Sequence, residues 1–161
     1  MATITLDARL TKQMSVGMKA YVRELVTRLP KIAPDLHFTV ISNEDFRTDN
    51  VRYVRISERT AKNVSWGEQI TLPRIARASG ANLTHFMSVY APRWPRVPYV
   101  YTIHDLIHRR FPQYFSWKIP PYYALVVGPV ARRARAVITD AQATTRDLVD
   151  DLEGNPFRRL W

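Results

Sequence analysis

The sequence contains no cysteine, few glycines and no long apolar run. The absence of cysteine from the 161 residues excludes disulfides, thiolate metal ligands and a cysteine nucleophile. No apolar run approaches the roughly 20 residues that a membrane-spanning helix needs. The first residues, Met1 to Asp7, lack the basic start and the long apolar core of a secretory signal peptide. We therefore expect a cytoplasmic protein, folded around a hydrophobic core because 46% of its residues are hydrophobic.

Acidic residues are almost absent from the middle of the chain. Between Thr71 and Arg135 there are ten basic residues and a single acid, Asp105, so this segment carries +9 of the net charge of +10. Such asymmetry indicates an anionic partner, which is nucleic acid, acidic lipid headgroups or phosphates, or else an arginine-rich solvated surface. We find no nucleic-acid recognition motif in the chain.

Apolar runs alternate with helical periodicities along the sequence. Helical spacing follows the first apolar run from Tyr21 to Leu29, and Pro30 and Pro34 are expected to end that helix. The alternation predicts an α/β fold with a Rossmann-like, doubly wound and mostly parallel sheet, formed by residues 1–153 with 154–161 as a tail. The expected strands are Thr3–Leu6, Phe38–Ile41, Val51–Ile56 as an outer strand, Leu83–Phe86, Val97–Ile103 as the central strand, and Ala136–Thr139.

The helical segment before the fourth strand carries a start signal and a break. Ser65 followed three residues later by Glu68 predicts a capping box. Pro73 lies inside the helical pattern and is expected to kink the helix or divide it in two. Glu68, like its neighbour Gln69, is interpreted as ordinary surface polarity. Thr139 or Asp140 is expected to cap the last helix.

The first strand–helix junction is a candidate phosphate site. Backbone N–H groups at a helix N-terminus attract anions in this architecture. Gly17 would let a phosphate approach the backbone, and Lys19 adds a positive charge in the first helical turn. Alternatively, Gly17 is only a turn residue. The dinucleotide fingerprint and the P-loop are both absent.

A histidine and an aspartate follow directly after the fifth strand. Ligands of open α/β sheets bind beyond the carboxyl ends of the strands, so His104 and Asp105 are candidate site residues, with His104 bonding to a sugar or phosphate oxygen. The alternative is a histidine satisfied by the backbone. His104 and His108 also mimic a helical metal pair, but that requires one helix through both residues, and we expect no metal. His85, like His37, is interpreted as structural.

The stretch from Arg109 to Tyr123 combines aromatic and basic residues. Aromatic rings beside cations are typical of a membrane interface or of contact with a lipid-linked acceptor. The aromatic residues in question are Tyr114, Phe115, Trp117, Tyr122 and Tyr123, and the basic ones are Arg109, Arg110 and Lys118. The other interpretation is a set of core aromatics beneath a solvated face.

With these pieces placed, the sequence resembles the N-terminal, acceptor-side half of a GT-B glycosyltransferase of the retaining family 4 type. The order and spacing of several stretches carry the resemblance over nearly the whole chain. They are Ile4–Arg9, Gly17–Val26, Trp66–Pro73, Thr102–Leu106, and Val137–Thr139 followed by Thr144–Leu148.

The resemblance implies a transferase that takes a nucleotide sugar as substrate and needs no cofactor and no obligatory metal. Gly17 with Lys19 falls where the glycine-rich loop meets the donor diphosphate, although a second glycine of many members is missing here. His104, with Asp105 beside it, falls where a cleft histidine contacts the transferred sugar. On this resemblance we assign three further residues to the acceptor side, and these are Ser15, Tyr90 and Arg109.

The family's second, donor-binding domain is not found in the sequence, so we expect little or no transferase activity from this chain alone. A C-terminal GT-B half supplied in trans is one expected partner, and the acceptor is a sugar or a lipid-linked molecule. Peripheral contact with the anionic inner face of the membrane is a further expectation. The alternative function is a non-catalytic basic module that binds anionic membrane or nucleic acid.

Overall fold

The computed structural model describes residues 1–10, 14–46, 48 and 51–151. They form one six-stranded sheet in which every neighbouring pair is parallel, with the strand order β3-β2-β1-β4-β5-β6. The predicted Rossmann-like sheet is therefore confirmed, with β3 at its edge. The expectation of a central fifth strand is wrong, because β5 lies next to the edge strand β6 and the two middle strands are β1 and β4. The strands are β1 (Thr3–Asp7), β2 (His37–Ser42), β3 (Val51–Arg55), β4 (Leu83–Phe86), β5 (Tyr99–Thr102) and β6 (Ala136–Ile138).

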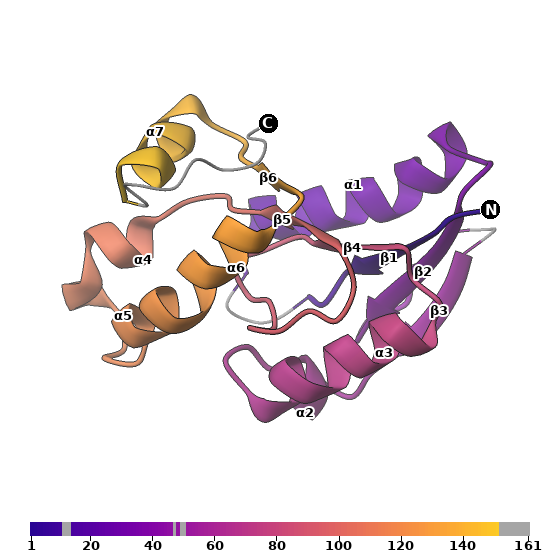
Figure 1. Cartoon of the computed structure of the whole chain (residues 1–161), viewed down its shortest axis with the longest axis horizontal. Coiled ribbons are helices and arrows are strands. Elements are labelled where there is room, and N and C mark those ends of the chain that lie inside the picture. The colour runs from indigo at the N-terminus through magenta and orange to yellow at the C-terminus, as the bar shows by residue number, and fades with distance from the viewer. Residues whose placement is uncertain (11–13, 47, 49–50, 152–161) are drawn as a thin grey trace.

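Helices cover both faces of the sheet (Figure 1). Alternate residues of a strand point to opposite faces, so Leu6 and Val40, which pair across β1 and β2, share one face. That face packs against the buried Val22 and Val26 of helix α1 (Val16–Ile32). On the opposite face, Ile41 packs with residues of α2 (Glu58–Ala61) and α3 (Leu72–Ala78).

Helix α1 continues beyond Pro30, the first of the two prolines expected to end it, and stops before the second, Pro34. Pro30 lies inside the last turn, which ends at Ile32. The C-cap residue is Ala33, whose N–H donates to the carbonyl of Leu29 at 3.0 Å. A proline this close to a helix end removes only one backbone hydrogen bond, and the Pro30 ring is buried. Burial of the Pro30 ring favours continuation of the helix past Pro30.

Two prolines divide helical segments at wider turns. The π-helix η1 (Gly67–Thr71) leads directly into α3, with Pro73 as its second residue, which confirms the predicted break. The same arrangement recurs where α5 (Ile119–Tyr122) and the π-helix η3 (Tyr123–Val127) lead into α6 (Gly128–Arg133), where Pro129 is the second residue. Proline has no N–H for the bond to the fourth preceding carbonyl, and a π turn accommodates that missing bond.

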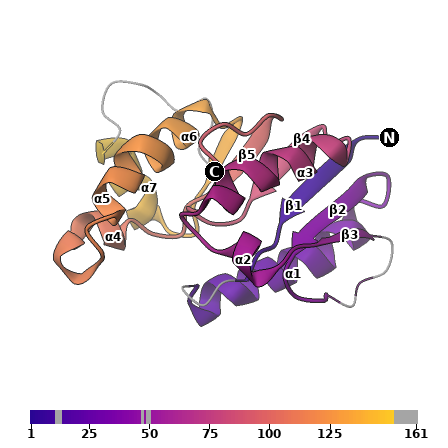
Figure 2. The ribbon, with the colours of Figure 1, turned by 90° about the horizontal axis from the view of Figure 1, so that it is seen from below.

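The remaining elements follow β5 and β6. They are α4 (Ile107–Arg110), the single turn η2 (Pro112–Tyr114) and α7 (Gln142–Asp151). Figures 1 and 2 both place α4 and α5 at the end of the molecule opposite the N-terminus. Among the residues described, no helix has the length and apolar character that crossing a bilayer requires.

Two glycines make opposite demands on the backbone. Gly80 closes α3 with φ +73°, whereas Gly17 lies in the first turn of α1, and a Cβ at either position meets open space or a single oxygen at 4.0 Å. We expect Gly80→Ala to lower the free energy of unfolding by about 1 kcal/mol, because alanine disfavours positive φ. Gly17→Ala should leave that free energy unchanged or slightly higher, because alanine favours the helix. Urea unfolding of both variants tests the contrast, and equal losses would contradict it.

Candidate functional site

All carboxyl ends of the strands meet at one edge of the sheet because every strand is parallel. The strand order reverses direction between β1 and β4, and this reversal is where ligands bind in open α/β sheets. Met87 follows β4 directly, and the Nε2 of His104, beyond the end of β5, lies 3.1 Å from the Met87 carbonyl oxygen. His104 therefore lies beyond the carboxyl end of β5, as its sequence position predicted, and contacts the residue that follows β4, one of the two strands at the reversal.

The acidic partner of His104 is Asp140. The register of β5 and β6 pairs Thr102 with Ile138, and two residues further along each chain His104 Nδ1 lies 3.0 Å from the Asp140 carboxylate. Asp105 instead accepts a hydrogen bond from the N–H of Ile107 at 3.1 Å, at the start of α4. His104 and Asp105, proposed from the sequence as one site pair, therefore have separate roles: His104 contacts Asp140 at the rim, and Asp105 accepts a backbone hydrogen bond at the start of α4.

Sequence reasoning missed Asp140 as a site residue. The signal was available, because Asp140 follows β6 at the same rim where His104 follows β5. The expectation that it or Thr139 caps the last helix is wrong: α7 begins at Gln142, and the N–H of Thr145 bonds to the carbonyl of Ala141 at 3.1 Å. The Asp140 side chain is half-exposed, while that of His104 is 8% exposed.

Both ring nitrogens of His104 face acceptors. The Met87 carbonyl can only accept, so Nε2 carries a proton and donates it. Nδ1 faces a carboxylate, so the contact with Asp140 is a hydrogen bond when a proton lies between the two groups. The ring is held in one orientation by these two contacts, and Asp140 is the more exposed of them.

Tyr21 connects helix α1 to this rim. Alternate residues of an extended chain point to the same face of a sheet. Thr102 at the end of β5 and His104 two residues beyond it therefore both lie on the face that α1 covers. The Tyr21 hydroxyl lies 3.1 Å from Thr102 Oγ1, and its ring meets the His104 ring edge-on at 4.9 Å. Tyr21 is four residues, about one helical turn, after Gly17. The start of α1 and His104 therefore lie at the same rim of the sheet.

The start of α1 is an open helix N-terminus. The Ser15 side chain caps it, accepting from the N–H of Met18 at 3.2 Å, so this residue assigned to the acceptor side has a local structural role. Gly17 is exposed, and its only near neighbour at the Cβ position is the Ser15 hydroxyl oxygen at 4.0 Å. Lys19 is half-buried in the first turn.

A buried charge cluster lies behind the rim. The guanidinium of Arg9 bonds both oxygens of Asp7 at 2.8 Å, donates to the Tyr90 carbonyl at 2.6 Å, and lies 3.4 Å from Glu68 Oε2. Glu68 is fully buried and also accepts from the Tyr122 hydroxyl at 2.8 Å. The interpretation of Glu68 as surface polarity is therefore wrong.

Glu68 also fixes the segment before its own helix. Its N–H donates to Ser65 Oγ at 3.2 Å, which confirms one half of the predicted capping box. Its carboxylate does not return to Ser65 but accepts from the N–H of Val64 at 3.2 Å. Val64 has φ +52°, which is strained for a β-branched residue. The Glu68 side chain points inward, toward Arg9, so the second hydrogen bond of a capping box, from the Ser65 N–H to the Glu68 carboxylate, is replaced by these contacts.

Burial sets the proton affinities in this cluster. Burial raises the pKa of Glu68, and the charge of Arg9 and the Tyr122 hydrogen bond oppose that rise. Burial would lower the pKa of Arg9, but the charges of Asp7 and Glu68 outweigh it, so that pKa is raised and Arg9 stays charged. The cluster is a permanent buried cation held by two carboxylates.

The comparison with known proteins agrees with this geometry. A family model described as Glycosyltransferase Family 4 matches residues 16–158 of the chain. The chain belongs to Glycosyltransferase Family 4. A search of curated proteins finds no match. The family match confirms the family 4 part of the resemblance drawn from the sequence, and the parallel sheet is consistent with a glycosyltransferase N-terminal domain.

The other two residues assigned to the acceptor side of this family 4 domain lie apart. Tyr90 is buried, with its ring 6.2 Å from that of Tyr122. Arg109 is exposed on α4. The loop that holds Tyr90 is fixed at a second point, where the N–H of Arg93 donates to Gln69 Oε1 at 2.8 Å. Gln69 is half-buried and, like Glu68, was wrongly interpreted as surface polarity.

The histidines of the metal-like motif do not share a helix. His104 precedes α4, whereas His108 lies within it and packs its ring 4.2 Å from that of Phe115. In the portion of the chain that the structure covers, no group of three or more potential metal ligands comes together. His85 is buried in β4 and bonds to Thr102 Oγ1 at 2.8 Å, in keeping with a structural role.

We expect Glu68→Ala to lower the free energy of unfolding by about 3–5 kcal/mol, because it leaves the buried Arg9 cation one partner short and removes the acceptor for Tyr122. Glu24→Ala, which removes the exposed partner of Arg28 on α1, is the matched control and should cost about 0.5 kcal/mol or less. Urea unfolding measures both. Similar small losses would show that the cluster does not hold the fold together.

Burial, with a smaller contribution from His104, lowers the pKa of His85 to about 4. Between about pH 6.5, the ordinary pKa of histidine, and about pH 4, the unfolded chain binds a proton at His85 and the folded chain does not. The free energy of unfolding therefore falls as the pH falls through this range. This histidine alone should remove about 3 kcal/mol between pH 7 and pH 4. We expect His85→Gln to flatten this fall in urea unfolding, and the exposed His37→Gln to leave it unchanged. Parallel curves for the wild type and His85→Gln would contradict the assignment.

Proposed function

We propose that this domain is the acceptor-side half of a retaining GT-B glycosyltransferase that uses a nucleotide sugar as donor. The observation that carries the proposal is the Tyr21 contact, which brings the N-terminal turn of α1 and the side chain of His104 to one rim at the strand-order reversal. An anion site and a hydrogen-bonding ring at one rim suit a substrate that joins a diphosphate to a sugar.

In this proposal the start of α1 receives the donor diphosphate. Backbone N–H groups at the helix N-terminus point outward, and the open space beside Gly17 lets a phosphate oxygen approach them. Lys19 adds a charge in the same turn. The net positive charge of the chain, +10, raises the local concentration of an anionic donor.

His104 then orients the transferred sugar. Its Nε2 proton is engaged by the Met87 carbonyl, so Nδ1 is the nitrogen that a sugar hydroxyl can reach, by displacing the half-exposed Asp140 carboxylate. In the transfer, the bond from the anomeric carbon to the diphosphate breaks and a bond to the acceptor oxygen forms. The acceptor proton leaves with the diphosphate or with a base of the completed cleft. His104 holds the sugar in place for this exchange and is a positioning group in the ground state.

The donor nucleotide and its sugar also need the second Rossmann-like domain, which the described residues do not include. We therefore propose a C-terminal GT-B half as the partner, with little transfer by this domain alone. Neither a metal nor a cofactor is proposed for the reaction.

The test is transfer of a labelled sugar from nucleotide-sugar donors to sugar and lipid-linked acceptors, with and without a C-terminal half of a family 4 enzyme. We expect turnover only with both halves. His104→Ala should then reduce turnover by about 100-fold or more, since a positioning contact of this kind is lost. His37→Gln, on the opposite edge of the sheet, should leave turnover unchanged. Efficient transfer by this domain alone would overturn the need for a partner.

Gly17→Ala separates donor binding from folding, because it is expected to leave stability intact. Titration of the labelled domain with inorganic pyrophosphate, followed by amide NMR, should shift the resonances of residues 16–19 in the wild type and shift them less in Gly17→Ala. Pyrophosphate shifts confined to residues away from α1 would overturn the donor site while leaving the family assignment untouched.

A further inference from the structure

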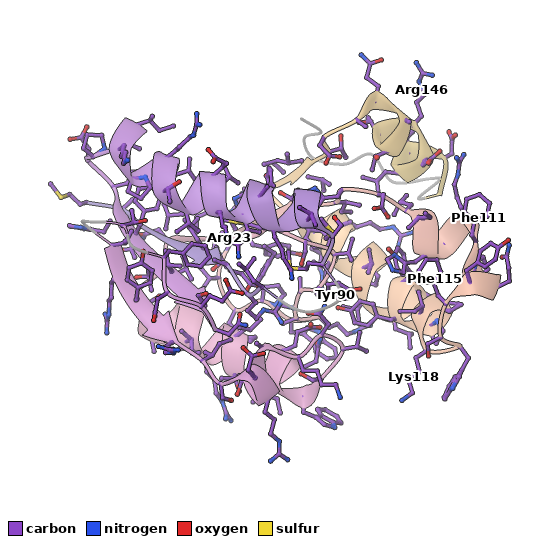
Figure 3. All side chains as sticks on the ribbon, turned by 180° about the vertical axis from the view of Figure 1, so that it is seen from behind. Arg23, Tyr90, Phe111, Phe115, Lys118 and Arg146 are labelled. Atoms are coloured by element: carbon purple, nitrogen blue, oxygen red, sulfur yellow. The ribbon has the colours of Figure 1, made fainter. Side chains whose placement is uncertain are left out.

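One end of the molecule exposes aromatic side chains between basic ones. Tyr114 is 78% exposed and Trp117 is 79% exposed, and Phe111 is also exposed. Figure 3 shows Phe111 and Lys118 at this end, while Tyr90 lies nearer the middle of the molecule. We call this surface the aromatic–basic ridge, and it consists of Phe111, Tyr114, Trp117, Arg109, Arg110 and Lys118, carried by α4, η2 and the start of α5.

The structure divides the aromatic run of this segment into two groups. Tyr122 and Tyr123 are buried in the core, and Phe115 packs against His108. These residues follow the core interpretation of the sequence. Tyr114 and Trp117 do not, because large aromatic side chains that are more than three-quarters exposed add little to the core of this domain. Phe111 is about half exposed, and its ring lies 6.5 Å from that of Tyr114.

The charge of the ridge is of one sign. The sequence contains no acid between Asp105 and Asp140. Lys118 lies beside the Trp117 ring, with its ammonium nitrogen 5.7 Å from the ring centroid. Arg110 is engaged with Asp147 at 2.8 Å, so part of its charge is balanced locally. The remaining surface presents aromatic rings with cations interleaved among them.

We propose that the aromatic–basic ridge is a docking surface for an anionic lipid bilayer. Tryptophan and tyrosine favour the headgroup level of a bilayer, and lysine and arginine beside them bind acidic lipid phosphates. A protein partner fits less well, because lysine is depleted at protein interfaces, whereas Lys118 lies directly beside the most exposed aromatic ring here. The proposal does not depend on the transferase function, since docking is measured without sugar transfer.

The test is co-sedimentation of the whole chain with vesicles of phosphatidylcholine alone and with vesicles containing 30 mol% phosphatidylglycerol. We expect binding to the anionic vesicles only, weakening as salt rises. The double variant Tyr114→Ala/Trp117→Ala should bind at least about tenfold more weakly, because two aromatic side chains leave the interface. Lys118→Glu should weaken binding by about tenfold through charge reversal.

Matched controls separate the ridge from diffuse positive charge. Trp94→Ala removes an exposed tryptophan outside the ridge, and Lys31→Glu reverses an exposed lysine at the far end of α1. Both should bind anionic vesicles as the wild type does. Equal loss in the controls and the ridge variants would overturn the proposal, as would absence of binding to anionic vesicles. Self-association or oligonucleotide binding that the double variant abolishes, without vesicle binding, would assign the ridge to another partner and also overturn it.

Discussion

The rim of this domain depends on a buried positive charge. Arg9 lies just beyond the end of β1 and is 4% exposed, so it needs anionic partners inside the fold. Asp7 comes from its own strand, and Glu68 comes from η1, 59 residues further along the chain. Through these contacts one guanidinium fixes the end of a middle strand, the start of a crossover helix and the loop after β4. A buried ion cluster adds little net stability over an apolar core, but it accepts only one arrangement of its parts.

That requirement explains several features that are costly in isolation. Val64 holds a strained φ of +52° while its N–H donates to Glu68. The Tyr122 hydroxyl is buried, and burial raises its pKa well above the ordinary value, so it stays protonated and donates to the same carboxylate. The strained Val64 backbone and the buried Tyr122 hydroxyl each supply one hydrogen-bond donor to the Glu68 carboxylate. The loop from 87 to 96, which carries the Met87 carbonyl that holds His104, is anchored to this cluster through Tyr90.

Most of the sheet could be predicted from local patterns, because buried parallel strands appear as short apolar runs and the helices that cover them follow a period of 3.6. Pro73 broke its helix as predicted, since the missing N–H is a local property. The sequence could not show which polar residue turns inward: Glu68 has the spacing of a surface residue, and its partner Arg9 is 59 positions away. That Asp140 lies at the same rim as His104 could be inferred from the sequence, but their pairing depends on the register between β5 and β6, which spacing within one strand does not reveal. Strand order failed for the same reason, because β5 is as apolar as a middle strand.

The proposed ridge and the proposed sugar site are mechanically coupled. Two residues, Asp105 and Leu106, separate His104 from α4, and Leu106 is buried while Asp105 caps the helix start. So short a connection, with Leu106 packed in the core and Asp105 bonded to the N–H of Ile107, ties the position of α4 closely to that of His104. Docking of α4 and α5 would therefore hold His104 at a set height above the lipid headgroups. An acceptor dissolved in water gains nothing from that constraint, whereas a lipid-linked acceptor is brought within reach while its chain stays in the bilayer. If both proposals hold, the geometry favours the lipid-linked class of acceptor over the free sugar.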